Sequence, residues 1–149
     1  MPNSTPSQTI GPFFHGALNG LVSAPPTPQG WVTVRGRVLD LDAKPVADAL
    51  LEFSLSAAAS DKLRFQRAFT DDDGHFQFLL PAASHAHVTL FARGLLKHLF
   101  TLVYLMAQSV PSHVPDSRRV TLIAQPAGDE FRWDIRLRGE GETVFFELR

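Results

Sequence analysis

The chain has 149 residues, which suits one domain with its own core, and its 14 basic and 15 acidic side chains leave a net charge of −1. This near balance implies no basic face, so we expect no nucleic-acid partner. Cysteine is absent, which excludes disulfides, thiolate metal ligands and a cysteine nucleophile and fits a reducing, cytoplasmic location. The first residues do not resemble a signal peptide, and no apolar run reaches the ~18 residues that cross a membrane, so we expect no membrane partner.

The first 30 residues differ from the rest of the chain because they are rich in proline and have no periodic pattern. Proline interrupts helices and removes a donor from sheets, so no long regular element is expected there. The stretch Ile10–Phe14 is nevertheless too apolar for a free tail. We therefore predict an irregular N-terminal interface arm over residues 1–30, which lies on its own chain or on a partner, and a β-sandwich domain over residues 31–149.

Most of the remaining chain alternates apolar and polar residues, the pattern of strands that bury one face. No long helix is expected, but Asp116 could cap a short helix that continues through Ala124. Short strands separated by turn signals predict an all-β fold, an antiparallel β-sandwich. The eight expected strands cover residues 31–40, 49–55, 65–70, the segment around Phe76 and Phe78, and residues 85–92, 99–105, 131–138 and 144–148.

Two glycines mark special backbone positions in this pattern. Gly36 interrupts the first strand and predicts a bulge or a point of close approach. The pair Asp73-Gly74 predicts a tight hairpin turn. The run that begins at Asp71 could also hold calcium, but it lacks the downstream glutamate of a complete calcium loop, so the sequence favours a plain hairpin.

The strand expected from His85 to Phe91 has the sharpest chemical signal. Because side chains on a strand alternate, His85 and His87 lie on one side, roughly 7 Å apart, together with Thr89 and Phe91. Two imidazoles at this spacing could bind a metal if oxygen ligands came from elsewhere. Such a pair is more often two hydrogen-bonded histidines at a cleft or an interface, and the sequence leaves both interpretations open.

The end of this strand carries an arginine that could recognise an anion. Arg93-Gly94 breaks the strand, and the Arg93 guanidinium could clamp a carboxylate with two parallel hydrogen bonds. An ordinary ion pair is the alternative. Lys97 and His98 are expected at the surface or in an interface. Nucleophile elbows, phosphate loops and paired catalytic carboxylates are missing from the sequence, so a hydrolase or nucleotide-binding function has no support.

Four blocks of the sequence carry a resemblance to a known family. They are Thr5–His15, Phe91–Thr101, Pro115–Ala124 and Phe131–Phe146. These blocks are similar to the intradiol ring-cleavage dioxygenases and, within them, to the alpha subunits of the enzymes that cleave protocatechuate. They extend from one end of the chain to the other. The block from Gly36 to Phe76 is less specific, because many transthyretin-like sandwich modules share it.

The resemblance implies an assembly of alpha and beta subunits around non-haem ferric iron. In that family the beta subunit binds Fe(III) with two tyrosines and two histidines, and the alpha subunit lacks functional iron but forms part of the substrate pocket. Carried over by position, Thr9, Gly11 and Pro12 would approach the beta subunit's site, and Arg93 would lie on the pocket wall near the substrate's carboxylate. These four are the expected protocatechuate-binding residues, and no catalytic or metal-binding residue is expected in this chain.

The residues of this chain agree with an iron-free role. His85 and His87 fall where the resemblance places the histidine ligands of the catalytic subunits, but Tyr104 is the single tyrosine of the sequence. The family also has longer or different segments where this chain has Leu79–Ser84 and Leu51–Ala57. Both changes fall around the ancestral metal pocket and suggest that this pocket has collapsed.

The function that follows from the resemblance is that of an iron-free alpha subunit. Its holoenzyme would convert protocatechuate and O2 to 3-carboxy-cis,cis-muconate. The alternative is a transthyretin-like sandwich that binds or self-associates and has no enzymatic partner. The apolar residues Ile10, Phe13 and Phe14 favour the first hypothesis, because a solitary module has little reason to keep an exposed apolar arm.

Overall fold

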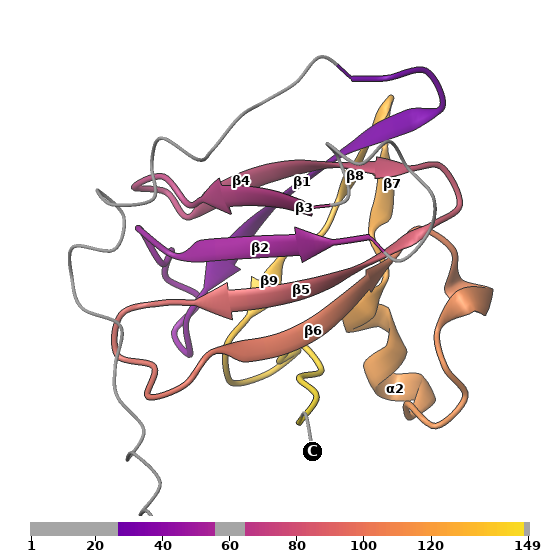
Figure 1. Ribbon diagram of the computed structural model, residues 1–149. Helices are drawn as coiled ribbons and strands as arrows, with labels where there is room; N and C mark the ends of the chain where they lie inside the picture. The colour runs from indigo at the N-terminus through magenta and orange to yellow at the C-terminus, as the bar shows by residue number, and fades with distance from the viewer. Residues whose placement is uncertain (1–26, 56–64, 148–149) are drawn as a thin grey trace, which may run out of the picture.

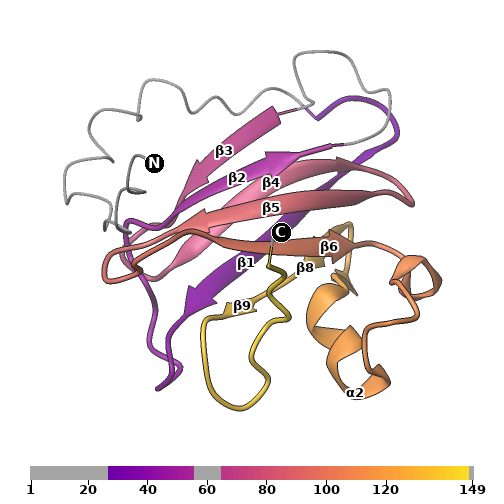
Figure 2. The same cartoon turned by 60° about the horizontal axis from the view of Figure 1, so that its bottom comes forward.

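The computed structural model describes residues 27–55 and 65–147, which form two packed β-sheets (Figures 1 and 2). One sheet has the order β4 (His75–Pro81), β1 (Trp31–Leu39), β8 (Glu130–Arg132) and β7 (Gln125–Ala127), with β9 (Ile135–Arg136) also paired to β1. The other has the order β3 (Phe65–Phe69), β2 (Leu50–Ser54), β5 (His85–Phe91) and β6 (Leu99–Tyr104). The predicted β-sandwich is confirmed.

The core lies between the two sheets and follows from the alternation along each strand. On β5, the side chains of Ala86, Val88 and Leu90 are 0% exposed. Phe53 from β2 and Phe78 from β4 stack across the gap, with ring centroids 3.8 Å apart and an angle of 10° between the ring planes. Burying a side chain of this size contributes about 1.5–3 kcal/mol, so this inner layer is the main source of stability.

Strand pairing is antiparallel throughout the second sheet but mixed in the first. β1 pairs antiparallel with β4 along most of its length, and β7 pairs antiparallel with β8. β8 and β9 instead run parallel to β1. The predicted antiparallel sandwich therefore contains two parallel contacts that the sequence pattern did not indicate. Alternation shows which face of a strand is buried, but it does not show the direction of a partner that lies far away in the sequence.

Gly36 is the predicted point of close approach, and β1 has no bulge there. A Cβ at Gly36 would lie 1.7 Å from the carbonyl oxygen of Trp133. The Trp133 N–H donates to the carbonyl of Arg35 at 2.8 Å, and the Asp134 carboxylate accepts the N–H of Arg37 at 2.9 Å. Trp133 and Asp134 thus lie between two short strands, and the single strand expected here is divided into β8 and β9.

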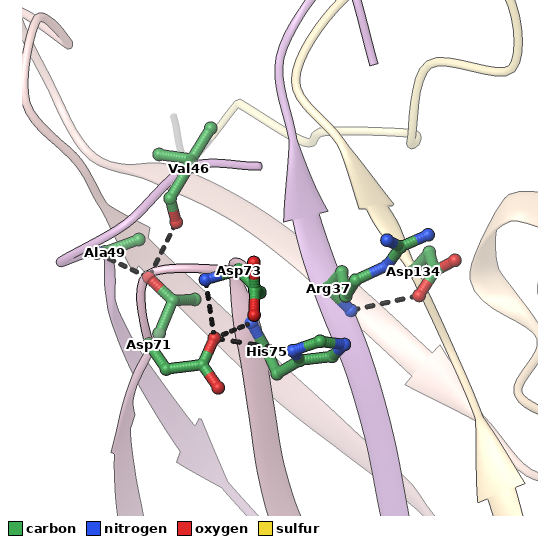
Figure 3. A network of polar contacts seen from close by, with 8 residues as sticks. Arg37, Val46, Ala49, Asp71, Asp73, His75 and Asp134 are labelled. Atoms are coloured by element: carbon green, nitrogen blue, oxygen red, sulfur yellow. Dashed lines mark hydrogen bonds and ion pairs between the residues drawn. The ribbon is translucent and has the colours of Figure 1, made fainter. Parts of the chain in front are cut away.

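The hairpin between β3 and β4 has its turn at the predicted position (Figure 3). Gly74 has a φ of +76°, and a Cβ there would lie 2.8 Å from the Val38 carbonyl oxygen. Asp71 Oδ1 accepts the N–H of His75 at 2.8 Å and the N–H of Asp73 at 3.0 Å. The hydrogen bond from His75 is the main cause that lowers the pKa of Asp71. This carboxylate therefore organises the turn, as expected for a plain hairpin.

The connection between β6 and β7 is only partly helical, and it lies beside the end of β6 (Figures 1 and 2). It contains η3 (Ala107–Ser109), α2 (Asp116–Arg119) and η4 (Val120–Leu122). The predicted helix is thus shorter than expected and ends before Ala124. Its N-cap is Pro115 rather than Asp116. Val120 is 59% exposed, whereas Leu122 and Ala124 are buried.

Of the strand expected over residues 144–148, the described part up to residue 147 forms one bridge, between Phe146 and Phe100 on β6. The Thr101 hydroxyl also donates to the Val144 carbonyl at 2.8 Å. This segment covers the edge of β6, which would otherwise offer unpaired backbone groups to other chains. None of the helices in residues 27–55 and 65–147 has the length and apolar character needed to cross a membrane.

Candidate functional site

The outer face of β5 carries both predicted histidines, as the alternation requires. The ring centroids of His85 and His87 are 5.9 Å apart. Tyr104, which lies opposite His85 on β6, stacks on the His85 ring at 5.2 Å with an interplanar angle of 23°. Burial and, second, the neighbouring His87 lower the pKa of His85. The His85 imidazole is therefore neutral near pH 7, the state in which it can accept a hydrogen bond or bind a metal.

These residues do not fit the ferric site that the resemblance describes. Such a site needs two phenolates, and Tyr104 is the single tyrosine. Burial raises the pKa of Tyr104, which opposes its conversion to a phenolate, and its ring is stacked against His85. Within the described parts of the chain, no group of three or more histidine, aspartate or glutamate side chains is placed to hold a metal ion. The described residues of this face therefore do not supply the ligands of such a ferric centre.

Arg93 lies just beyond the other end of β5. Gly94, with a φ of +82°, turns the chain there as predicted. The Arg93 guanidinium donates to Asp48 Oδ2 at 2.8 Å, and the two side chains are 58% and 36% exposed. The ion pair that was the alternative for Arg93 is therefore present, but its exposure leaves the guanidinium accessible to a further anion.

Aromatic rings follow Arg93 on the same outer face. The His98 ring lies 5.5 Å from the Phe91 ring and meets the Phe100 ring edge-on at 4.6 Å. Leu96 is 68% exposed, and Lys97 and His98 are also exposed, as expected for surface or interface positions. This end of the sheet thus combines one accessible guanidinium with exposed apolar and aromatic groups.

The histidine pair and Arg93 lie at opposite ends of β5. The six steps of β5 from His85 to Phe91 span roughly 20 Å at the usual rise of a strand, and Arg93 follows two residues later. Thr9, Gly11 and Pro12 lie outside the described residues. Arg93 therefore cannot act on a group held by the histidine pair of the same chain.

Two cavities lie away from both ends of β5. One, of about 650 Å³, lies along β3 and β4, where the Gln66 side-chain amide bonds to both the N–H and the carbonyl of Leu79. The other, of about 290 Å³, lies between β1 and β8 among basic side chains that include Arg35 and Arg37. In the sequence these arginines are only polar residues of an alternating strand, so no pattern there predicts this second cavity.

Comparison with known proteins identifies the family. The chain is 32% identical to the protocatechuate 3,4-dioxygenase alpha chain of Burkholderia cepacia, over 97% of this chain and 97% of that one. It is 29% identical to the protocatechuate 3,4-dioxygenase alpha chain of Pseudomonas putida, over 97% of this chain and 96% of that one. The chain belongs to the protocatechuate 3,4-dioxygenase alpha-chain family. The resemblance seen in the four sequence blocks is thereby confirmed. No family model matches the chain.

Solved structures agree with the fold of this alpha-chain family member. The dioxygenase domain of a carbohydrate-binding fusion protein from Streptomyces sp. SirexAA-E superposes with a TM-score of 0.53 at 22% identity, over 92% of this chain and 99% of that chain. Hydroxyquinol 1,2-dioxygenase from Pseudomonas putida DLL-E4 superposes with a TM-score of 0.55 at 17% identity, over 90% of this chain and 66% of that chain. At these identities the likeness supports the intradiol-dioxygenase-like sandwich and nothing finer.

The two alpha-chain alignments also show that this family member is short. They extend over 191 and 193 positions, whereas the chain has 149 residues. Its relatives therefore have insertions that this chain lacks. One connection that is short here is the turn between β4 and β5, where the Ser84 hydroxyl donates to the Pro81 carbonyl at 2.6 Å.

Proposed function

We propose that the chain is the iron-free, cytoplasmic alpha subunit of a protocatechuate 3,4-dioxygenase and forms part of the substrate pocket beside a ferric beta subunit. The observation that supports this proposal most strongly is the match to two alpha chains over 97% of this chain. The holoenzyme would insert both atoms of O2 between the two hydroxyl-bearing carbons of protocatechuate, giving 3-carboxy-cis,cis-muconate. Iron chemistry is assigned to the partner because Tyr104 cannot supply two phenolates.

The end of β5 supports a pocket shared with a partner. Arg93 is accessible and lies beside exposed apolar groups, although neither described cavity includes it. A guanidinium can bind a carboxylate with two parallel hydrogen bonds, and protocatechuate has one carboxylate. We assign Arg93 to the part of the pocket wall that faces this group. The arm residues Thr9, Gly11 and Pro12 are assigned to the same pocket by position in the family.

The experiment that tests this function is co-expression of the full chain with a candidate beta chain. We expect one co-eluting complex that contains iron and cleaves protocatechuate. Arg93→Ala should leave the complex intact but raise KM for protocatechuate about tenfold or more, because a charge-assisted hydrogen bond is lost. Catechol, which has no carboxylate, should react equally poorly with both complexes.

Arg138→Ala is the matched control. Arg138 is exposed, and its substitution removes the same charge from a position that is not on β5. It should leave KM unchanged. A chain that elutes alone and does not alter the activity of the beta chain would overturn the subunit proposal. An active complex in which Arg93→Ala changes nothing would overturn only the role of Arg93.

A further inference from the structure

Four cationic or titratable side chains form a row on the outer face of the first sheet. Arg35 and Arg37 alternate along β1 on the side opposite its buried residues. Arg132 on β8 lies directly opposite Arg35, and His75 on β4 lies directly opposite Arg37. Like charges placed opposite each other destabilise a sheet. A negative charge close to these side chains would therefore offset their mutual repulsion.

The nearby carboxylates supply that charge only in part. Glu130 pairs with Arg35 at 2.7 Å, and one oxygen of Asp134 lies 3.6 Å from Arg132. The other Asp134 oxygen accepts the backbone N–H of Arg37 rather than its guanidinium. Two carboxylates thus face three guanidinium groups. Of these three, the Arg37 side chain has no ion pair with any described residue.

Arg37 also has an unsatisfied donor. Its Nε is buried and has no hydrogen-bond partner among the described residues. A buried donor without an acceptor is costly, and the cost is greater when the group is charged. Figure 3 shows Arg37 on β1, with Asp134 on the neighbouring segment and His75 on β4. An anion from outside the described chain would balance the charge of this guanidinium group.

The space for such an acceptor is present. The cavity of about 290 Å³ is lined by Arg35, Arg37 and Arg132, together with His75 and Glu130. This volume is at the lower limit of the roughly 300–1,000 Å³ of ligand pockets, so it suits a small ligand. The planar guanidinium group matches the geometry of carboxylate and phosphate oxygens.

We propose that this pocket binds a small oxyanion, a carboxylate or phosphate group, held by the guanidinium groups of Arg37 and Arg132. The site lies in the other sheet from Arg93 and the histidine pair, and it is independent of the proposed dioxygenase function. The bound anion neutralises the surplus charge between β1 and β8 and accepts hydrogen bonds from the guanidinium groups that line the cavity. It therefore strengthens the parallel contact between two strands that lie far apart in the sequence.

The test is titration of the full chain, with any subunit that co-purifies, in a low-salt cationic buffer. Inorganic phosphate and citrate are the two probes, and binding is followed by calorimetry and by the unfolding temperature. We expect saturable binding of at least one probe and a rise in unfolding temperature. Arg37→Met should weaken binding about tenfold or more, because a charge-assisted hydrogen bond is lost while the apolar stem is kept.

Arg138→Met is the matched control, since it removes an exposed arginine outside the cavity and should bind as the wild type does. Without a probe, Arg37→Met should unfold at the same temperature as the wild type or higher, because charge repulsion is relieved. A lower temperature would indicate a structural role and contradict the proposal. If Arg37→Met does not fold, Arg132→Met gives the same test. Absence of saturable binding, or equal weakening in the control, would overturn the site.

Citrate and phosphate distinguish two sources of the oxyanion. Tighter binding of citrate would identify a carboxylate ligand, and tighter binding of phosphate would identify a phosphate ligand. Chloride at high concentration should displace either, because the interaction is electrostatic. Binding that does not respond to salt would contradict the role of the arginines.

Discussion

The two faces of β5 have opposite properties, although they alternate along the same seven residues. The inner face packs Val88 and Leu90 into the core, where both are fully buried. The outer face carries His85 and His87, whose rings lie 5.9 Å apart and which are only partly covered. The two faces of β5 therefore relate to different properties of the chain, its fold and its function. The inner face accounts for membership of the sandwich class, while the outer face has histidines without the phenolates that a ferric centre needs.

The difference between the two faces of β5 is tested most strongly by a charge placed on each face. Val88→Asp buries an unpaired carboxylate between the sheets and should cost more than about 4 kcal/mol of unfolding free energy, enough to prevent folding. His87→Asp, one residue away, places the same group at an exposed position and should cost less than about 1 kcal/mol. Chemical denaturation and yield of soluble protein measure both. Equal losses would show that the outer face is also part of the core.

Truncating one side chain on each face of β5 compares how much packing contributes to stability on the two faces. Leu90→Ala should lower the unfolding free energy by about 2–5 kcal/mol, because it leaves a cavity in a fully buried position. Thr89→Ala, on the outer face, should lower it by less than about 1 kcal/mol. The two variants are measured side by side by urea denaturation. A small effect of Leu90→Ala would mean that the core can collapse around the lost side chain.

The stability of the folded chain should depend on pH through His85 on the outer face of β5. Because burial and His87 lower the pKa of His85 in the folded chain, the unfolded chain takes up the proton first as pH falls. The stability contributed by neutral His85 is complete above the unfolded pKa of ~6.5 and is lost as pH falls through the folded pKa. His85→Gln should therefore flatten the loss of stability on acidification from pH 7 to pH 5.

His87→Gln provides the matched test of the second cause. It removes a neighbouring positive charge and should move the pKa of His85 part of the way back to its ordinary value, as measured by NMR titration of the imidazole. The account is wrong if His85 in the wild type titrates at or above the ordinary value.

Arg93→Ala should have the smallest effect on stability. Its ion pair with Asp48 is exposed, with side chains 58% and 36% accessible, and such pairs contribute about 0–1 kcal/mol. Thermal unfolding should therefore change little, even though the proposed pocket loses its guanidinium. A large loss of stability would mean that Arg93 has a structural role, and an effect on KM could then not be assigned to the substrate.

Much of the fold could be predicted from local pattern. The alternation from His85 to Phe91 identified the strand and both of its faces, and Gly36 and Gly74 identified a close approach and a turn. These features depend on neighbouring residues or on one backbone angle, so a single sequence contains the necessary information.

The features that were missed depend on contacts between distant segments. The parallel pairing of β8 with β1, and the division of the expected strand at Trp133, result from hydrogen bonds to residues about 97 positions away. The cluster of Arg37 and Arg132 arises from the same pairing. The helix expected to end at Ala124 was too long because Ile123 is extended and forms a bridge with Tyr104 on β6.

The most direct test of the central claim is the iron content of the full chain purified alone and together with a beta chain, after expression with added iron. The account predicts that the isolated chain contains no stoichiometric iron and shows no tyrosinate-to-iron absorption, and that both appear only in the complex. Stoichiometric iron on the isolated chain, lost in His87→Ala, would contradict the account, because the outer face of β5 would then be a metal centre.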